Sequence, residues 1–155
     1  MRKVFLAFAL LMTATMVAEA QTNDRAIGIR LGNGAELSYQ HPFSGNTRLE
    51  ADLGLYGLGE RNAFIASGIY QWLWNIDGGL DWYAGLGAQL GTRWYKNEVE
   101  TWESGFGLAI AGQIGLAYNF PIPLQLSLDY RPALYFLPEV GGSYDYVALG
   151  IRYRF

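Results

Sequence analysis

The chain has 155 residues, of which 51% are hydrophobic, with no cysteine and a formal net charge of −3. The lack of cysteine excludes disulfides, thiolate metal sites and a lipidated N-terminal cysteine, and the mildly acidic balance argues against nucleic acid as a partner. After residue 20 there is no run of about 20 apolar residues, which excludes membrane-spanning helices from the rest of the chain.

The first 20 residues have the pattern of a secretory signal peptide. Arg2 and Lys3 form the charged start, residues 4–17 form the apolar segment, and Ala18-Glu19-Ala20 is a small-x-small cleavage site. An uncleaved N-terminal membrane helix is the alternative, but the apolar core is short for a span. We therefore predict a signal peptide over residues 1–20 and one folded domain over residues 21–155.

Eight segments of the domain alternate with period two, which indicates β-strands and not helices. In chain order they cover residues 25–31, 35–41, 47–58, 63–74, 80–95, 106–120, 124–136 and 144–155. Gly32-Asn33-Gly34 is a tight-turn signal between the first two segments. Segment 47–58 alternates clearly, because leucines at 49, 53 and 55 share one face while Glu50 and Asp52 share the other.

Segment 63–74 has apolar residues on both faces. One face carries four aromatic residues, and the other carries Ile65, Ile69 and Leu73. We predict that the aromatic face is outward, because Ser67 and Gln71 then lie inside.

The longest segments are of a length that can cross a bilayer. From Phe106 to Phe120 every second side chain is apolar apart from Gly112, and the other face is small or polar. Fourteen strand steps at a tilt of about 40° rise roughly 35 Å, enough for an apolar band of about 25 Å and two interfacial girdles. Aromatic residues at the ends of such strands are predicted to form the girdles, here Trp82, Trp94, Phe106, Tyr118 and Phe120.

Segment 124–136 contains Pro132, which removes a donor from the strand ladder. We expect a bulge or a rim position at this residue. The last segment, 144–155, alternates up to Phe155.

Together these segments predict an all-β fold, an eight-stranded antiparallel up-and-down transmembrane β-barrel. A soluble ligand-binding barrel is the competing architecture, with an apolar interior and a polar exterior. Ten charged residues on the face opposite the large apolar side chains argue against it, because they cannot line a dry cavity. We predict instead that they form an ion-paired network in the interior: Arg30, Glu36, Glu50, Asp52, Asp81, Arg93, Asp129, Arg131, Arg152 and Arg154, with Arg48 as a further base at the rim.

The leader ending Ala-x-Ala, the run PIPLQLSLDYRPAL and the final segment YDYVALGIRYRF resemble the small eight-stranded outer membrane β-barrel protein family of Gram-negative bacteria. The resemblance implies an outer-membrane location and insertion by the barrel-assembly machinery. It also implies that Ile151, Tyr153 and Phe155 form the assembly signal. By the family rule, short turns and both termini face the periplasm, and segments 32–34, 57–62, 95–104 and 137–143 face outward.

The acidic segment 95–104 is the candidate for cation binding. Glu98, Glu100 and Glu103 supply the hard oxygen ligands that calcium or magnesium prefers, and such an ion would bridge lipopolysaccharide phosphates. A solvated acidic loop is the favoured interpretation, so no metal site and no cofactor are predicted.

An enzymatic function needs a nucleophile with a base within reach. His41 is the single histidine of the chain, and Ser38, three positions away, lies on the opposite face of its strand. Glu50 and Asp52 share a face as an acid and base pair would, but ion pairing with arginines is the simpler interpretation. No catalytic residue is therefore predicted.

These observations favour a structural or interaction protein that maintains the membrane or displays short loops. The alternatives are a lipid-modifying enzyme, an acyltransferase or deacylase, and a narrow ion-conducting channel. The expected partners are membrane lipids, lipopolysaccharide and the barrel-assembly machinery, and a monomer is expected.

Overall fold

The computed structural model describes residues 24–43, 45–57, 62–96 and 99–155. No helix among these residues is long and apolar enough to cross a membrane. The strands are β1 (Ala26–Leu31), β2 (Gly34–Pro42), β3 (Thr47–Tyr56), β4 (Ala63–Asp77), β5 (Leu80–Lys96), β6 (Trp102–Asn119), β7 (Leu124–Tyr130), β8 (Ala133–Leu137), β9 (Gly141–Ser143) and β10 (Val147–Arg154).

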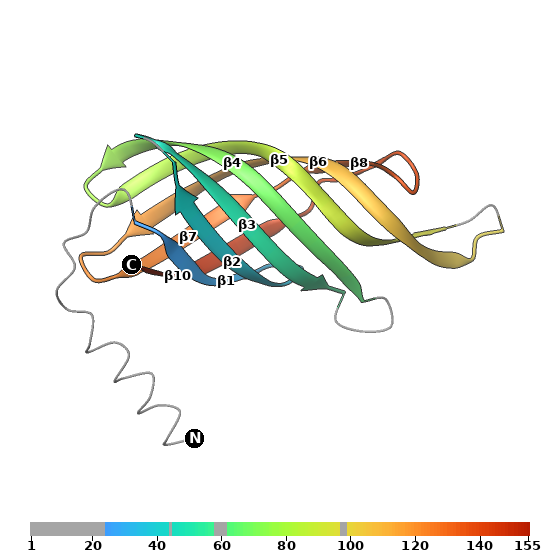
Figure 1. Cartoon of the computed structure of the whole chain (residues 1–155). Helices are drawn as coiled ribbons and strands as arrows, with labels where there is room; N and C mark the ends of the chain where they lie inside the picture. The colour runs from blue at the N-terminus through green and yellow to red at the C-terminus, as the bar shows by residue number, and fades with distance from the viewer. Residues whose placement is uncertain (1–23, 44, 58–61, 97–98) are drawn as a thin grey trace, which may run out of the picture.

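The strands form a closed antiparallel barrel (Figure 1). β1 to β6 each pair with the next strand in sequence, and the ring closes where Ala26 pairs with Arg154 of β10. β7 and β8 both pair with β6, while β9 and β10 pair with β8 and β7. β7 and β8 together act as one interrupted strand, and so do β9 and β10. The described residues therefore make eight spans, as predicted.

At Pro132 the strand is interrupted, but the expected bulge is not at this residue, because Tyr130 pairs with Ile114 and Ala133 pairs with Ala111 in one continuous register. β7 ends at Tyr130 and β8 begins at Ala133, where the Arg131 N–H donates to the Tyr146 carbonyl at 2.9 Å. Tyr146 lies in the gap between β9 and β10, so the two interruptions face each other and this hydrogen bond joins them. The predicted strand 144–155 is corrected accordingly: its pairing begins at Gly141 and stops over residues 144–146.

Other boundaries differ because ladders run past the alternating pattern. β6 begins at Trp102, four residues earlier than predicted, since it pairs with β5 as far as Lys96. β4 continues to Asp77 through an irregularity after Asn75. β3 ends at Tyr56, and residue 58 of the predicted strand lies outside the described residues, as do residues 1–20 of the predicted signal peptide.

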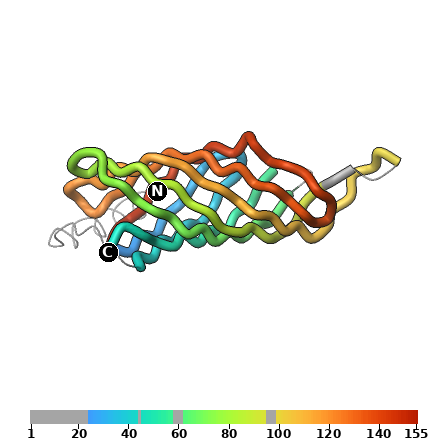
Figure 2. The backbone as a smooth tube through the Cα atoms, turned by 90° about the horizontal axis from the view of Figure 1, so that it is seen from above, coloured from blue at the N-terminus to red at the C-terminus, as the bar shows by residue number. Residues whose placement is uncertain are grey.

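The two ends of the barrel differ (Figures 1 and 2). The turn end carries the short connections β2–β3, β4–β5 and β6–β7 together with Asp24 and Phe155, whose strands lead into it. The loop end carries the connections β1–β2, β3–β4, β5–β6 and β8–β9, and the β5–β6 hairpin extends beyond the rest of the barrel.

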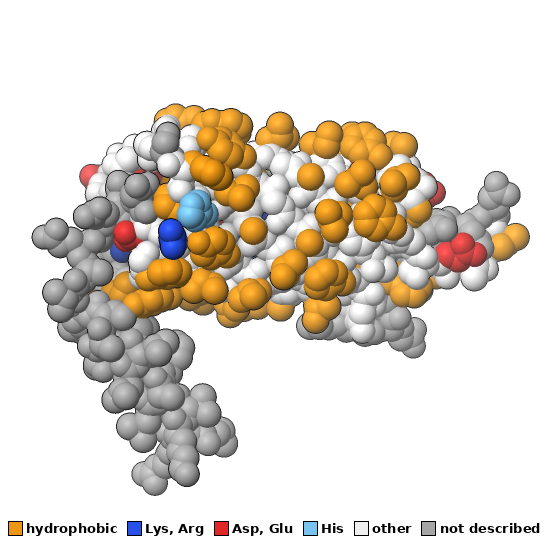
Figure 3. All heavy atoms as spheres, in the orientation of Figure 1, with side chains coloured by type: hydrophobic (Ala, Val, Ile, Leu, Met, Phe, Trp, Pro, Cys, Tyr) orange, Lys and Arg blue, Asp and Glu red, His pale blue; other side chains and the backbone are white. Residues whose placement is uncertain are grey.

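Large apolar side chains cover the outside of the barrel (Figure 3). On β6 the side chains of Leu108, Ile110 and Ile114 are 38–52% exposed, whereas Ala109, Ala111 and Gln113 on the other face are at most 4% exposed. Alternation therefore separates an apolar wall from a filled interior.

On β4 the aromatic face is outward, as predicted. Phe64, Tyr70 and Trp72 are exposed, while Ser67 and Gln71 are buried.

Glycines make room for the larger inward side chains. A Cβ atom at Gly115 would lie 2.6 Å from Asp129 Cβ and 2.7 Å from Tyr83 Cζ. Only a glycine at this position lets these two side chains approach the wall of β6.

Candidate functional site

Alternation places charged side chains from five spans in the barrel interior. Seven of the described residues form what we call the central cluster. They come from β1, β2, β3, β10 and the β7 span, and each is at most 2% exposed: Arg30, Glu36, Glu50, Asp52, Asp129, Arg131 and Arg152.

Glu50 is the hub of the central cluster. Its Oε1 lies 2.7 Å from Arg131 Nη2, and its Oε2 lies 2.8 Å from Arg152 Nη2. Two amides also donate to it, from Gln40 at 2.6 Å and Gln113 at 3.0 Å. Four donors therefore converge on one carboxylate that has no access to water.

Each arginine of the cluster joins several strands. Arg131 Nη2 is also 2.7 Å from Asp52 Oδ2, and Arg131 Nη1 donates to Ser67 Oγ at 2.9 Å. Arg152 donates to Ser38 Oγ at 2.9 Å and to Ser127 Oγ at 2.7 Å. These contacts fix the guanidinium planes across the interior.

Arg30 completes the central cluster. It pairs with Glu36 and Asp129, and lies 3.6 Å from Asp52 and 3.8 Å from Glu50. A charge out of water is tolerated only when it is paired and hydrogen-bonded. Each charged group of the cluster meets this condition with a group of opposite charge.

Neutral side chains supply the remaining hydrogen bonds. Tyr56 donates to Glu36, and Tyr83 donates to Asp129 at 3.0 Å. Gln71 donates to Gln113 Oε1 at 2.7 Å. Sequence reasoning based on charge missed these residues, although their place on the inward face of their strands was visible in the same period-two pattern.

Three members of the predicted ten-residue network lie apart from the central cluster. Asp81, towards the turn end, accepts hydrogen bonds from the amides of Asn75 and Asn119, each at 2.8 Å. It makes no ion pair within the described part of the chain. The alternation placed Asp81 on the inward face but did not show its height along the barrel.

The other two, Arg154 and Arg93, lie near opposite ends of the barrel. Arg154, at the turn end, donates to the carbonyls of Phe120 at 2.7 Å and Ile122 at 3.1 Å, and it lies 3.8 Å from Asp24. Arg93, towards the loop end, lies over the Tyr135 ring, with its Cζ 4.4 Å from the ring centroid. Its Nη1 donates to the Glu139 carbonyl at 3.0 Å. Arg154 thus holds the β6–β7 connection, and Arg93 holds the β8–β9 connection.

The predicted girdle residues lie towards both ends of the wall. Trp82, Phe106 and Tyr118 are exposed, while Trp94 and Phe120 are half-buried. Trp82 stacks on Trp74, with ring centroids 4.2 Å apart.

Further aromatic side chains lie near the turn end. Tyr39, His41, Phe43, Tyr70 and Trp72 contact one another in sequence along β2–β4. Ile151 and Phe155 of the predicted assembly signal are exposed on the wall, and Tyr153 is half-buried beside Phe155 with ring centroids 6.3 Å apart.

The remaining candidates form no site in the described residues. Glu98 lies outside them, Glu100 and Glu103 are exposed, and the described chain holds no group of three side chains suited to a metal ion. His41 Nδ1 lies 3.2 Å from Tyr39 Oη on the outer wall, whereas Ser38 is buried against Arg152. The two side chains lie on opposite faces of β2, as the alternation predicted.

Comparisons with protein-family models and with curated proteins gave no match. Comparison with solved structures did. The N-terminal β-barrel domain of Pseudomonas aeruginosa OprF matches with a TM-score of 0.60 at 16% identity, over 85% of this chain and 96% of that one. Neisserial surface protein A matches with a TM-score of 0.61 at 13% identity, over 85% and 94%. This chain has the fold of the small outer-membrane β-barrels.

Two further matches support this fold. The attachment invasion locus protein of Yersinia pestis, Ail, matches with a TM-score of 0.53 at 20% identity, over 85% of this chain and 94% of that one. A designed transmembrane β-barrel matches with a TM-score of 0.57 at 15% identity, over 89% and 100%. These barrels share the architecture of this chain, although their sequences are at most 20% identical to it.

The hub role of Glu50 predicts a large loss of stability in Glu50→Gln. The substitution removes the ion pair that the structure shows for Arg152 among the described residues and leaves Arg131 paired with Asp52, and breaking a buried pair costs about 3–5 kcal/mol. Unfolding by urea in lipid vesicles measures this free energy. Glu139→Gln, which changes an exposed carboxyl, serves as the control and is expected to match the wild type. Equal stability of the two variants would contradict the hub role.

Proposed function

We propose that this protein is a monomeric integral barrel of the Gram-negative outer membrane with a structural role, exported by a signal peptide over residues 1–20. The fold, the apolar wall and the aromatic belts support this proposal. Lipid tails would contact the wall, and the girdle side chains would lie at the headgroups of lipid and lipopolysaccharide.

The proposed orientation follows from the ends of the barrel. Short turns and termini of such barrels face the periplasm, and the longer loops face outward. The turn end would then be periplasmic, and the β5–β6 hairpin would project from the cell. Ile151 and Phe155 on the outer face of the last strand would be available to the barrel-assembly machinery.

We further propose that the central cluster closes the barrel to solutes. The observation that carries this proposal is the set of ion pairs across the interior, where Arg131 joins Glu50 and Asp52 at 2.7 Å and Arg30 spans from Glu36 to Asp129. An eight-stranded barrel has an interior just wide enough for side chains. The groups that fill it are held by several partners each.

Planar-bilayer recording tests the closed interior. The wild-type protein is expected to show no steady conductance. Arg131→Ala is expected to produce current steps, because it removes the guanidinium that joins Glu50 to Asp52 and Ser67. Arg93→Ala, outside the central cluster, is the control and should stay silent. Steady conductance of the wild type would contradict the proposal.

A deletion strain separates the structural role from the alternative of a lipid-modifying enzyme. The structural role predicts increased sensitivity to detergents with unchanged acylation of lipid A, measured by mass spectrometry. Both the wild-type gene and a His41→Ala variant should restore resistance. A change in lipid A acylation that the wild type restores and His41→Ala does not would overturn the structural role in favour of the enzyme.

A further inference from the structure

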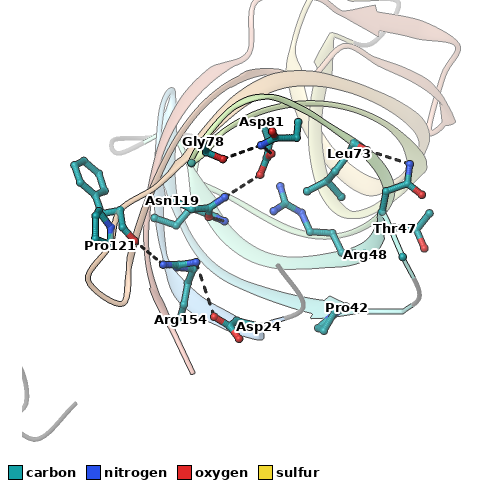
Figure 4. Close-up of a pocket in the computed structure, with 16 residues that line it drawn as sticks. Asp24, Pro42, Thr47, Arg48, Leu73, Gly78, Asp81, Asn119, Pro121 and Arg154 are labelled. Atoms are coloured by element: carbon teal, nitrogen blue, oxygen red, sulfur yellow. Dashed lines mark hydrogen bonds and ion pairs between the residues drawn. The ribbon is translucent and has the colours of Figure 1, made fainter. Parts of the chain in front are cut away.

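The interior opens at the turn end into a cavity of about 460 Å³ (Figure 4). It lies on the turn-end side of the central cluster and is lined by residues of the β2–β3, β4–β5 and β6–β7 connections. It falls in the size range of small-molecule sites, about 300–1,000 Å³.

Two arginines of this cavity have an unpaired nitrogen among the described residues, Arg48 at Nη2 and Arg154 at Nε, but Arg154 has an ion-pair partner in Asp24, whereas no ion pair is formed by Arg48. Its side chain extends from β3 toward the middle of the opening (Figure 4), although the residue is only 7% exposed. Its Nε donates to Gln71 Oε1, and its Cζ lies 4.9 Å from the centroid of the Tyr83 ring. Its Nη2 is buried and has no hydrogen-bond partner among the described residues.

The acids of the cavity have partners other than Arg48. Both oxygens of Asp81 accept amide hydrogen bonds, from Asn75 and Asn119, and Asp24 lies 3.8 Å from Arg154. Within the described residues, no carboxylate forms an ion pair with Arg48. A buried guanidinium with an unpaired terminal nitrogen is costly, and an acceptor from outside the protein would remove that cost.

The charge of the lining limits what this acceptor can be. The positive charges of Arg48 and Arg154 are balanced by the carboxylates of Asp24 and Asp81. A ligand with several negative charges would therefore be repelled by the two carboxylates without enough positive charge to offset the repulsion. A planar guanidinium edge matches the paired oxygens of a carboxylate or phosphate group.

We propose that the turn-end cavity binds a singly charged oxyanion, a carboxylate or a phosphodiester, through the terminal nitrogens of Arg48. Apolar side chains at the edge of the cavity, such as Leu73 and Phe120, would contact the organic part of the ligand. The site needs only the geometry of the turn end, so it does not depend on which side of the membrane that end faces.

Titration of the folded barrel in zwitterionic nanodiscs tests the site, with acetate and dimethyl phosphate as probes. Backbone amide NMR shifts of Gly78, Gly79 and Asn119 are expected to change and saturate with at least one probe. The probe that binds more tightly identifies the carboxylate or the phosphodiester as the preferred group. Sulfate, with two charges, is expected to bind more weakly than either.

Arg48→Gln is expected to weaken binding by about tenfold or more, since a hydrogen bond to a charged group is lost. Arg93→Gln, an arginine towards the loop end, is the control and should bind as the wild type does. A folded barrel changes its mobility on a gel when it is heated, so loss of this shift would identify a variant that does not fold. If Arg48→Gln does not fold, Arg48→Lys replaces it. This variant keeps the charge, loses the planar edge and should also bind more weakly. Absence of saturation in the wild type, or unchanged affinity in the folded Arg48 variant, would overturn the proposal and assign water alone to the cavity.

Discussion

The architecture depends on the pairing of buried guanidinium groups with buried carboxylates around Glu50. In a water-soluble protein an apolar interior drives folding, but here the large apolar side chains face outward. The interior must therefore be held by directed interactions. Arg30, Arg131 and Arg152 each join at least two spans through this cluster, and no single strand satisfies its own charges.

This arrangement explains the composition of the strands. Long arginine and glutamate side chains reach across the interior only where small residues on facing strands leave room, as Gly115 does beside Tyr83 and Asp129. Backbone hydrogen bonds are likewise made between strands. Closure of β1 on β10 removes the sheet edges, and the interruptions at Arg131 and Tyr146 pair with each other. A closed ring of paired strands suits contact with lipid, where no water is present to bond backbone groups.

Much of the fold could be predicted because alternation is a local property of the chain. The inward position of Ser67 and Gln71 and the interruption at Pro132 followed from spacing and from the missing N–H of proline. The ion-pair partner of each buried charge did not follow from the sequence. Arg131 and Asp52 are 79 positions apart and Arg152 and Glu50 are 102 apart, and their contact depends on the stagger of the strands. For the same reason Asp81 and Arg93, both predicted in the network, lie away from it, and the cavity at Arg48 had no sequence signal.

The most direct test of the inside-out arrangement uses the absence of native cysteine. Single cysteines at Ile110 and Gln113 carry spin labels in vesicle-inserted protein, and collisions with oxygen and with a water-soluble nickel complex report the surroundings of each label. The label at Ile110 is predicted to collide frequently with oxygen and rarely with nickel, because it contacts lipid, while the label at Gln113 is shielded from both. Frequent nickel collisions at Ile110 would contradict the arrangement.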